Sequence, residues 1–168
     1  LHRRHIMDFL PQWSGEGTDA LIALEATHRI DSLVLAFEQA LQQKAESASL
    51  SEAERDILIV EALEREVNNG GYRQFFISTA AEHVGIAVAA LTRIGCPATA
   101  DITARAIAEL GDVAASGPDA IAVWLLRDDE ARDRRLSACD AAYYASGEDI
   151  AGQLFAYIKR NHSAIQLP

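Results

Sequence analysis

The sequence predicts an all-α protein, a compact single-domain bundle of about seven or eight helices. Alanine is abundant and proline occurs only four times in 168 residues, which favours helices. No stretch of the chain combines the alternating apolar pattern and the β-branched enrichment of a strand. A hydrophobic fraction of 49% and a charged fraction of 24% are typical of a globular protein that buries a core.

The chain begins with a segment, residues 1–17, that we separate from one helical domain over residues 18–168. Its first residues precede the only methionine, Met7, and could stem from an expression vector rather than from the natural protein. We expect a loop over residues 11–17. Thr18 is the expected N-cap of a long helix that reaches about Glu46.

The next helix has the clearest start signal in the chain. Ser51 and Glu54 have the spacing of a capping box, in which each side chain bonds the other residue's backbone N–H. The helix is expected to end at Asn69, Gly70 and Gly71, and a short aromatic turn, Tyr72–Ser78, follows. Glycine or proline limits most of the remaining helices, which we expect at about 80–94, 97–110, 118–124, 137–145 and 148–161.

Composition and charge exclude several classes of function. The net charge of −10, from 25 acidic and 15 basic residues, disfavours direct binding of nucleic acid. No apolar run approaches the ~20 residues of a membrane-spanning helix, and no secretory signal is recognisable. The two cysteines lack a C-x-x-C spacing and the histidines do not cluster, so we expect reduced thiols, a cytoplasmic location and no metal site.

The most informative stretch runs from Glu66 to Phe76. On a helical wheel Glu66 falls within an apolar stripe, where a carboxylate is costly unless it is hydrogen-bonded. We therefore expect Glu66 to brace the turn by accepting backbone N–H groups of the loop that begins at Asn69. We interpret the stretch as a structural motif that comprises Glu66, Asn68, Asn69, Gly70, Gly71, Tyr72, Phe75 and Phe76.

No common catalytic motif is present, and we expect neither catalytic residues nor a cofactor. One alternative stays open: a small-molecule-binding or enzymatic domain with its pocket around Glu66, Asn69, Tyr72 and Gln74. That alternative requires a concave, solvent-connected pocket in which Glu66 is accessible.

Acidic residues are densest between Glu46 and Glu66. Glu54, Glu61 and Glu64 lie on one stripe of their helix, and they are our candidates for an acidic face that binds a partner. A second acidic group, Asp128–Glu130, is surrounded by arginines and is more typical of a solvated, salt-bridged helix face.

Residues from Leu50 to about Ile165 resemble a bacterial DNA-mimic protein family, the DMP type. The resemblance is carried by Leu50–Arg55, Glu66–Tyr72 with Gln74–Phe76, Ala90–Gly95, Ala100–Ala104, Tyr143–Tyr144 and Leu154–Ile158. It implies an all-helical fold, often dimeric, and an acidic face that occupies a helix-turn-helix repressor in place of DNA.

The leading hypothesis is therefore a non-enzymatic protein that binds a basic partner, such as a helix-turn-helix transcription regulator, and blocks its DNA site. It predicts one dominant negative patch on the surface, and an even interspersion of the 25 acids with the 15 bases would contradict it. A generic protein-interaction module is the remaining alternative.

Overall fold

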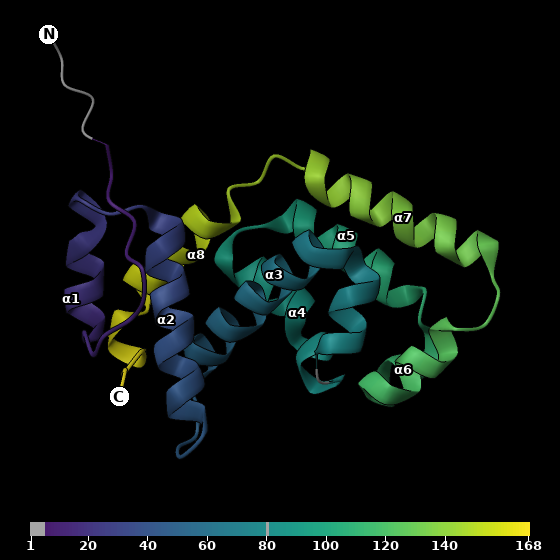
Figure 1. The fold of residues 1–168 in the computed structure, drawn as a ribbon, viewed down its shortest axis with the longest axis horizontal. Coiled ribbons are helices and arrows are strands. Elements are labelled where there is room, and N and C mark those ends of the chain that lie inside the picture. Colours follow the sequence, from purple (N-terminus) through teal and green to yellow (C-terminus); the bar gives the residue numbers. More distant parts are fainter. Residues whose placement is uncertain (1–5, 80) are drawn as a thin grey trace, which may run out of the picture. The chain divides into compact units, whose positions relative to one another are not determined.

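The computed structural model describes residues 6–79 and 81–168, and its regular elements are helices (Figure 1). The all-α prediction is confirmed: the described residues form eight α-helices and no strand, with one isolated β-bridge between Asp8 and His28. Residues 1–5, for which the sequence leaves open whether they belong to the natural protein, and Ala80 lie outside the described residues. The elements are α1 (Thr18–Ala23), η1 (Leu24–Ala26), α2 (Ile30–Ala45), α3 (Glu52–Ser78), α4 (Ala81–Ile94), α5 (Pro97–Ala108), η2 (Gly111–Ala115), α6 (Pro118–Leu125), α7 (Glu130–Ala145), α8 (Ile150–Arg160) and η3 (His162–Ala164).

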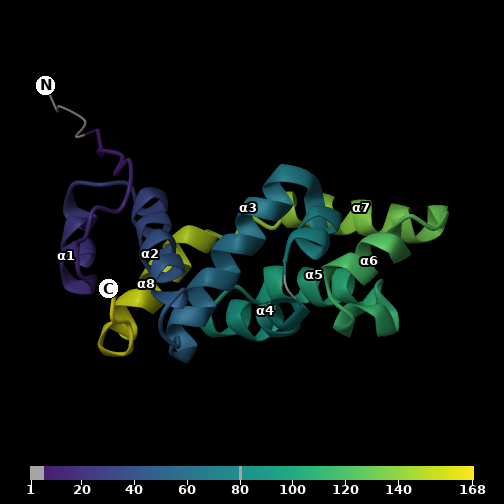
Figure 2. The same cartoon turned by 60° about the horizontal axis from the view of Figure 1, so that its bottom comes forward.

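The chain divides into two compact units. The first comprises the residues up to Leu58 together with Ile150–Pro168, and the second comprises Ile59–Asp149. In the first unit α2 packs against α8, and both views show the two helices side by side (Figures 1 and 2). The single domain expected over residues 18–168 stays a prediction.

The prediction of one helix from Thr18 to Glu46 is wrong, because the chain leaves the helical path after Ala26. The N-terminal segment takes the backbone groups that a continuous helix would use. The N–H of Asp8 donates to the carbonyl of Thr27, and the N–H of Arg29 donates to the carbonyl of Asp8, both at 2.8 Å. Thr18 is also not the N-cap, a position that Gly17 takes.

The predicted aromatic turn, Tyr72–Ser78, is helical instead. The chain kinks at Gly70 and Gly71, whose dihedral angles are not helical, and a helix resumes at once. Tyr72, Phe75 and Phe76 are fully buried on one face of that helix. Their spacing of three and four residues is the helical one, and it is the signal that a turn assignment missed.

The other helices of the second unit follow the sequence closely. Helix α4 packs against α5, and η2 contacts α4, α5 and α6. Pro97 and Pro118 lie in the first turns of α5 and α6, as predicted. Helix α7 is longer than predicted, because Asp129 caps it by accepting the N–H of Arg132 at 2.9 Å.

The C-terminal tail of the first unit is bound through its backbone. Thr18 donates its hydroxyl to the carbonyl of Ile165, and Ser51 donates to that of Ala164, both at 2.7 Å. Lys44 donates to the carbonyl of Gln166, whose N–H donates to Glu54, both at 2.8 Å. The side chain of Ile165 is buried.

Candidate functional site

The capping box predicted at the start of α3 is present, and it removes Glu54 from the surface. Glu54 accepts the N–H of Ser51 at 2.9 Å, and its own N–H donates to the Ser51 hydroxyl at 3.1 Å. The other carboxylate oxygen of Glu54 accepts a hydrogen bond from the Lys44 ammonium group at 2.8 Å. Burial opposes ionisation, but these hydrogen bonds outweigh it and lower the pKa of Glu54. Glu54 is only 1% exposed, so it contributes to the fold rather than to a partner-binding face.

The other two carboxylates of the predicted acidic face are also withdrawn from solvent. Glu61 is buried, and Glu64 is half-buried. Burial raises the pKa of Glu64, and the nearby carboxylate of Asp149 raises it further. A face built on Glu54, Glu61 and Glu64 would therefore expose little charge.

Gly71 lies at the centre of the motif, where the backbone comes very close to α7. Its φ of 72° and ψ of −172° belong to a region that is nearly restricted to glycine. A Cβ at this position would lie 2.4 Å from Oδ2 of Asp140. The other oxygen of Asp140, Oδ1, accepts the N–H of Tyr72 at 2.8 Å. The kink and the carboxylate that satisfies its free backbone donor are thus built together.

Glu66 does brace the kink, but not in the expected way. Its carboxylate accepts hydrogen bonds from the Arg65 and Gln74 side chains, each at 3.2 Å. Gln74 lies beyond the kink, so the contact joins its two sides through side chains. The carboxylate that accepts a backbone N–H of this turn is Asp140, which is 68 residues from Tyr72 and carries no local sequence signal. Asn68 and Asn69 are exposed.

The motif is closed on its buried side. The hydroxyls of Tyr72 and Thr103 are 2.8 Å apart and hydrogen-bonded, and Tyr72 has no exposed surface. Tyr144 donates its hydroxyl to the carbonyl of Val67 at 2.8 Å. These contacts argue against a substrate pocket between Glu66 and Tyr72. A shallow depression of about 690 Å³ lies elsewhere, along Glu130, Asp133, Arg134, Ser137 and Ala138 of α7.

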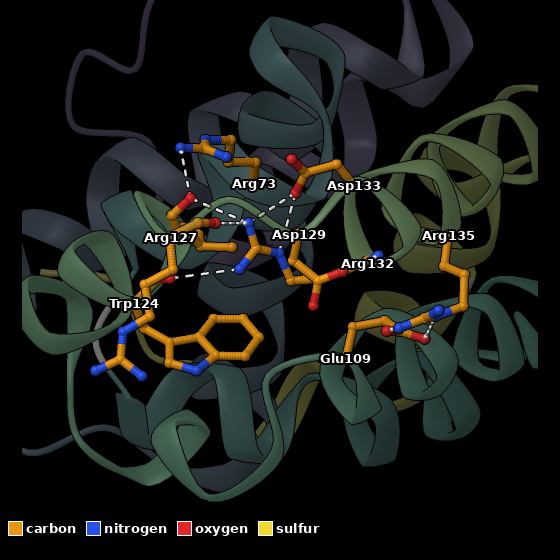
Figure 3. Close-up of polar contacts among 9 residues, drawn as sticks. Arg73, Glu109, Trp124, Arg127, Asp129, Arg132, Asp133 and Arg135 are labelled. Carbon is orange, nitrogen blue, oxygen red and sulfur yellow. Dashed lines mark hydrogen bonds and ion pairs between the residues drawn. The ribbon is translucent and has the colours of Figure 1, made fainter.

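A buried arginine joins α6 to α7 (Figure 3). Arg132 is 2% exposed, and its guanidinium donates to the carbonyls of Leu125 at 3.1 Å and Arg127 at 2.8 Å. It also lies over the Trp124 ring, 4.7 Å from the centroid, and pairs with Asp133. The Leu125 carbonyl belongs to the last residue of α6, where a helix favours positive charge, and the Arg127 carbonyl lies in the turn beyond it. The sequence pattern predicts a solvated helix face for this arginine. That prediction is wrong, because the burial of Arg132 depends on the turn between α6 and α7.

The two cysteines offer no nucleophile. Both are free and buried. Burial, followed by the nearby carboxylates of Glu148 and Glu64, raises the pKa of Cys96 to about 12, so its thiolate is scarce at neutral pH. Within residues 6–79 and 81–168, no group of three potential ligands is arranged to hold a metal ion. No helix in the same residues is long and apolar enough to span a membrane.

Acidic residues outnumber basic ones in both units. Residues 59–149 contain 15 acidic and eight basic residues, a formal net charge of −7, and the described residues of the first unit contain ten acidic and five basic residues, a net charge of −5. Arg105 is the single basic residue between Gly95 and Leu126 in the sequence. Four exposed carboxylates on or beside α5, η2 and α6 form no ion pair with another described residue: Asp101, Asp112, Asp119 and Asp128.

Comparison with known proteins places the chain in a family. Residues 48–161 match the model of the family described as DMP19-like protein. No curated protein and no solved structure matches the chain significantly. The match includes the capping box, the kinked motif and α4 to α8, which together make up well over half of the sequence. The chain therefore belongs to the DMP19-like protein family.

Proposed function

We propose that this protein is a non-enzymatic DNA mimic that binds a DNA-binding regulator and keeps it from its DNA site. The observation that carries the proposal is that a member of the DMP19-like family exposes four carboxylates that form no ion pair with another described residue, in and beside a stretch, residues 96–125, whose single basic residue is Arg105. The acidic face we propose is formed by Asp101, Asp112, Asp119 and Asp128, in place of the three glutamates of α3.

The physical basis is charge complementarity. A DNA-binding protein presents lysine and arginine side chains to phosphates that recur at ~3.4 Å per base pair on each strand. Exposed carboxylates without cationic partners can interact with the same side chains. Such carboxylates keep their full charge for a partner, whereas carboxylates in existing ion pairs, such as Glu109 with Arg135, are already neutralised.

The expected partner is a basic protein of the helix-turn-helix class, and the expected site of action is the cytoplasm, where such regulators bind DNA. A homodimer belongs to the same proposal, because two acidic faces would fit a dimeric regulator with two DNA-reading surfaces.

The proposal is tested by capturing partners from a lysate of the native host at low salt and at ~0.5 M salt, which shortens the Debye length to a few ångström. We expect a regulator that is captured at low salt, released at high salt and released from its operator DNA by the added protein. Asp112→Asn with Asp119→Asn should weaken capture. The matched control removes two exposed charges from the first unit, Asp8→Asn with Glu46→Gln, and should leave capture unchanged.

Capture of the same partner at both salt concentrations would contradict charge mimicry and favour a generic interaction module. Equal weakening by the two pairs of substitutions would contradict the location of the face, because only the overall charge would then matter.

A further inference from the structure

Two large apolar side chains are exposed on α6 and at its C-cap, in the stretch between Gly95 and Arg127 where Arg105 is the single basic residue. Val123 is 65% exposed and Leu126 is 76% exposed, whereas Ile121 and Leu125 on the other side of the same helix are buried. A spacing of three residues places Val123 and Leu126 next to each other on the outer face. The buried side already anchors α6, so packing within the chain does not explain these two residues.

The same outer face carries acidic charge. Asp119 precedes Val123 by one helical turn, so their side chains are neighbours. Arg127 and Asp128 follow Leu126 and are both exposed, and no ion pair joins them. The apolar pair therefore has the Asp119 carboxylate, which forms no ion pair with another described residue, one helical turn away.

We infer that Val123 and Leu126 form an apolar anchor for a basic protein partner that presents an exposed apolar side chain among its lysines and arginines. The inference rests on the proposed function and adds to it the chemistry of the partner's surface. The Asp119 carboxylate beside the anchor can pair with a lysine or arginine, and this pairing favours a basic partner. An adjoining apolar side chain on that partner would cover Val123 and Leu126, which are 65% and 76% exposed.

The anchor gives binding two components that respond differently to salt. Carboxylates attract the partner through a field that salt screens, and they chiefly speed association. Apolar side chains at the centre of an interface exclude water and chiefly slow dissociation. DNA has no equivalent of this apolar pair on its phosphate backbone, so the anchor would separate partners that merely bind polyanions from partners that fit this chain.

Two synthetic helical peptides with equal numbers of lysines test the inference. One carries leucines at positions i, i+3 and i+4 on the face beside the lysines, and the other carries serines there. We expect the full-length chain to bind the leucine peptide about tenfold more tightly at low salt, because the contact between its leucines and Val123 and Leu126 removes apolar surface from water. The double variant Val123→Ser, Leu126→Ser should lose that preference and keep the salt dependence of the serine peptide.

Two further variants separate the components. Asp112→Asn with Asp119→Asn should weaken the binding of both peptides, flatten the salt dependence and retain the leucine preference. Phe9→Ser, which removes a 52% exposed aromatic ring in the first unit, should change neither property. Thermal melts of all variants should coincide with that of the unmodified chain, since the replaced side chains are exposed.

The possible outcomes decide separately on the apolar anchor and on the acidic face. Equal binding of both peptides, or a leucine preference retained by the serine variant, overturns the anchor and leaves the acidic face intact. If neither peptide binds at low salt, the acidic face and the anchor both fail. If sedimentation shows a dimer that Val123→Ser, Leu126→Ser converts to a monomer, the pair is a contact between copies of this chain and the inference is wrong.

Discussion

Replacing Gly71 with alanine tests whether the kink in α3 and the carboxylate of Asp140 form one unit. The backbone at Gly71 has φ 72° and ψ −172°, where a residue with a side chain is strained by about 1–3 kcal/mol. The added methyl group would also lie 2.4 Å from Oδ2 of Asp140 and would displace it. Displacement breaks the hydrogen bond from the N–H of Tyr72, and an unsatisfied buried donor destabilises by a further ~1–3 kcal/mol.

The expected loss in the free energy of unfolding is therefore about 4 kcal/mol, measured by urea denaturation followed by circular dichroism. Gly117 provides a matched control. Its φ of 91° and ψ of 167° lie in a similar glycine-restricted region, but an added Cβ there would meet no atom within 4 Å. Gly117→Ala should thus show the backbone strain alone, about 2 kcal/mol.

A double-mutant cycle separates the two contributions. Asp140→Ala alone should destabilise by about 1–3 kcal/mol, because it leaves the N–H of Tyr72 without its acceptor. Combined with Gly71→Ala it should add little, since that hydrogen bond is already lost. If Gly71→Ala and Gly117→Ala destabilise equally, or if the Gly71 and Asp140 effects simply add, the close approach of the two residues has no energetic consequence and the reasoning is wrong.

Three further predictions concern buried charge. Arg132→Met should lower the free energy of unfolding by about 3 kcal/mol in a urea titration and shift the fluorescence of Trp124, since it leaves the carbonyls at and after the end of α6 without donors. The control Arg134→Met, at an exposed position, should change the same free energy by less than about 0.5 kcal/mol. Glu64→Gln should be more stable than the unmodified chain at neutral pH. Because folding raises the pKa of Glu64, this advantage should shrink as the pH falls through that raised pKa, and a constant or growing advantage would contradict the assignment. Folding lowers the pKa of Glu54, so its contribution should persist above pH ~4.3, its ordinary value, and disappear as the pH falls further; a Glu54→Gln chain should show a flatter loss of stability with acid over that range.

Local signals in the sequence were enough for the helical class and for several helix boundaries. The capping box of Ser51 and Glu54 and the prolines that open α5 and α6 act within a few residues, and the structure places them as expected. The break before α2 was missed because its cause is distant: the N-terminal segment takes the backbone groups of Thr27 and Arg29.

The candidate site also depends on contacts between residues that are distant in the sequence. The sequence identified the Glu66–Tyr72 motif, but not its partner Asp140, which lies on α7 and looks like any other acid on a helix. The choice of Glu54, Glu61 and Glu64 for an acidic face failed to anticipate burial, because acid density along the chain does not report which side of α3 faces solvent. Which carboxylates lack cationic partners is a property of the folded surface.

The way in which the C-terminal tail is bound has a consequence for sequence variation. Thr18, Ser51, Lys44 and Glu54 all contact main-chain atoms of residues 164–166, which every amino acid except proline can offer in full. Among residues 164–166, Ile165 alone has a buried side chain. A mutational scan of this tail should therefore tolerate most replacements at Ala164 and Gln166, reject proline at Gln166, and select for apolar residues at one position alone.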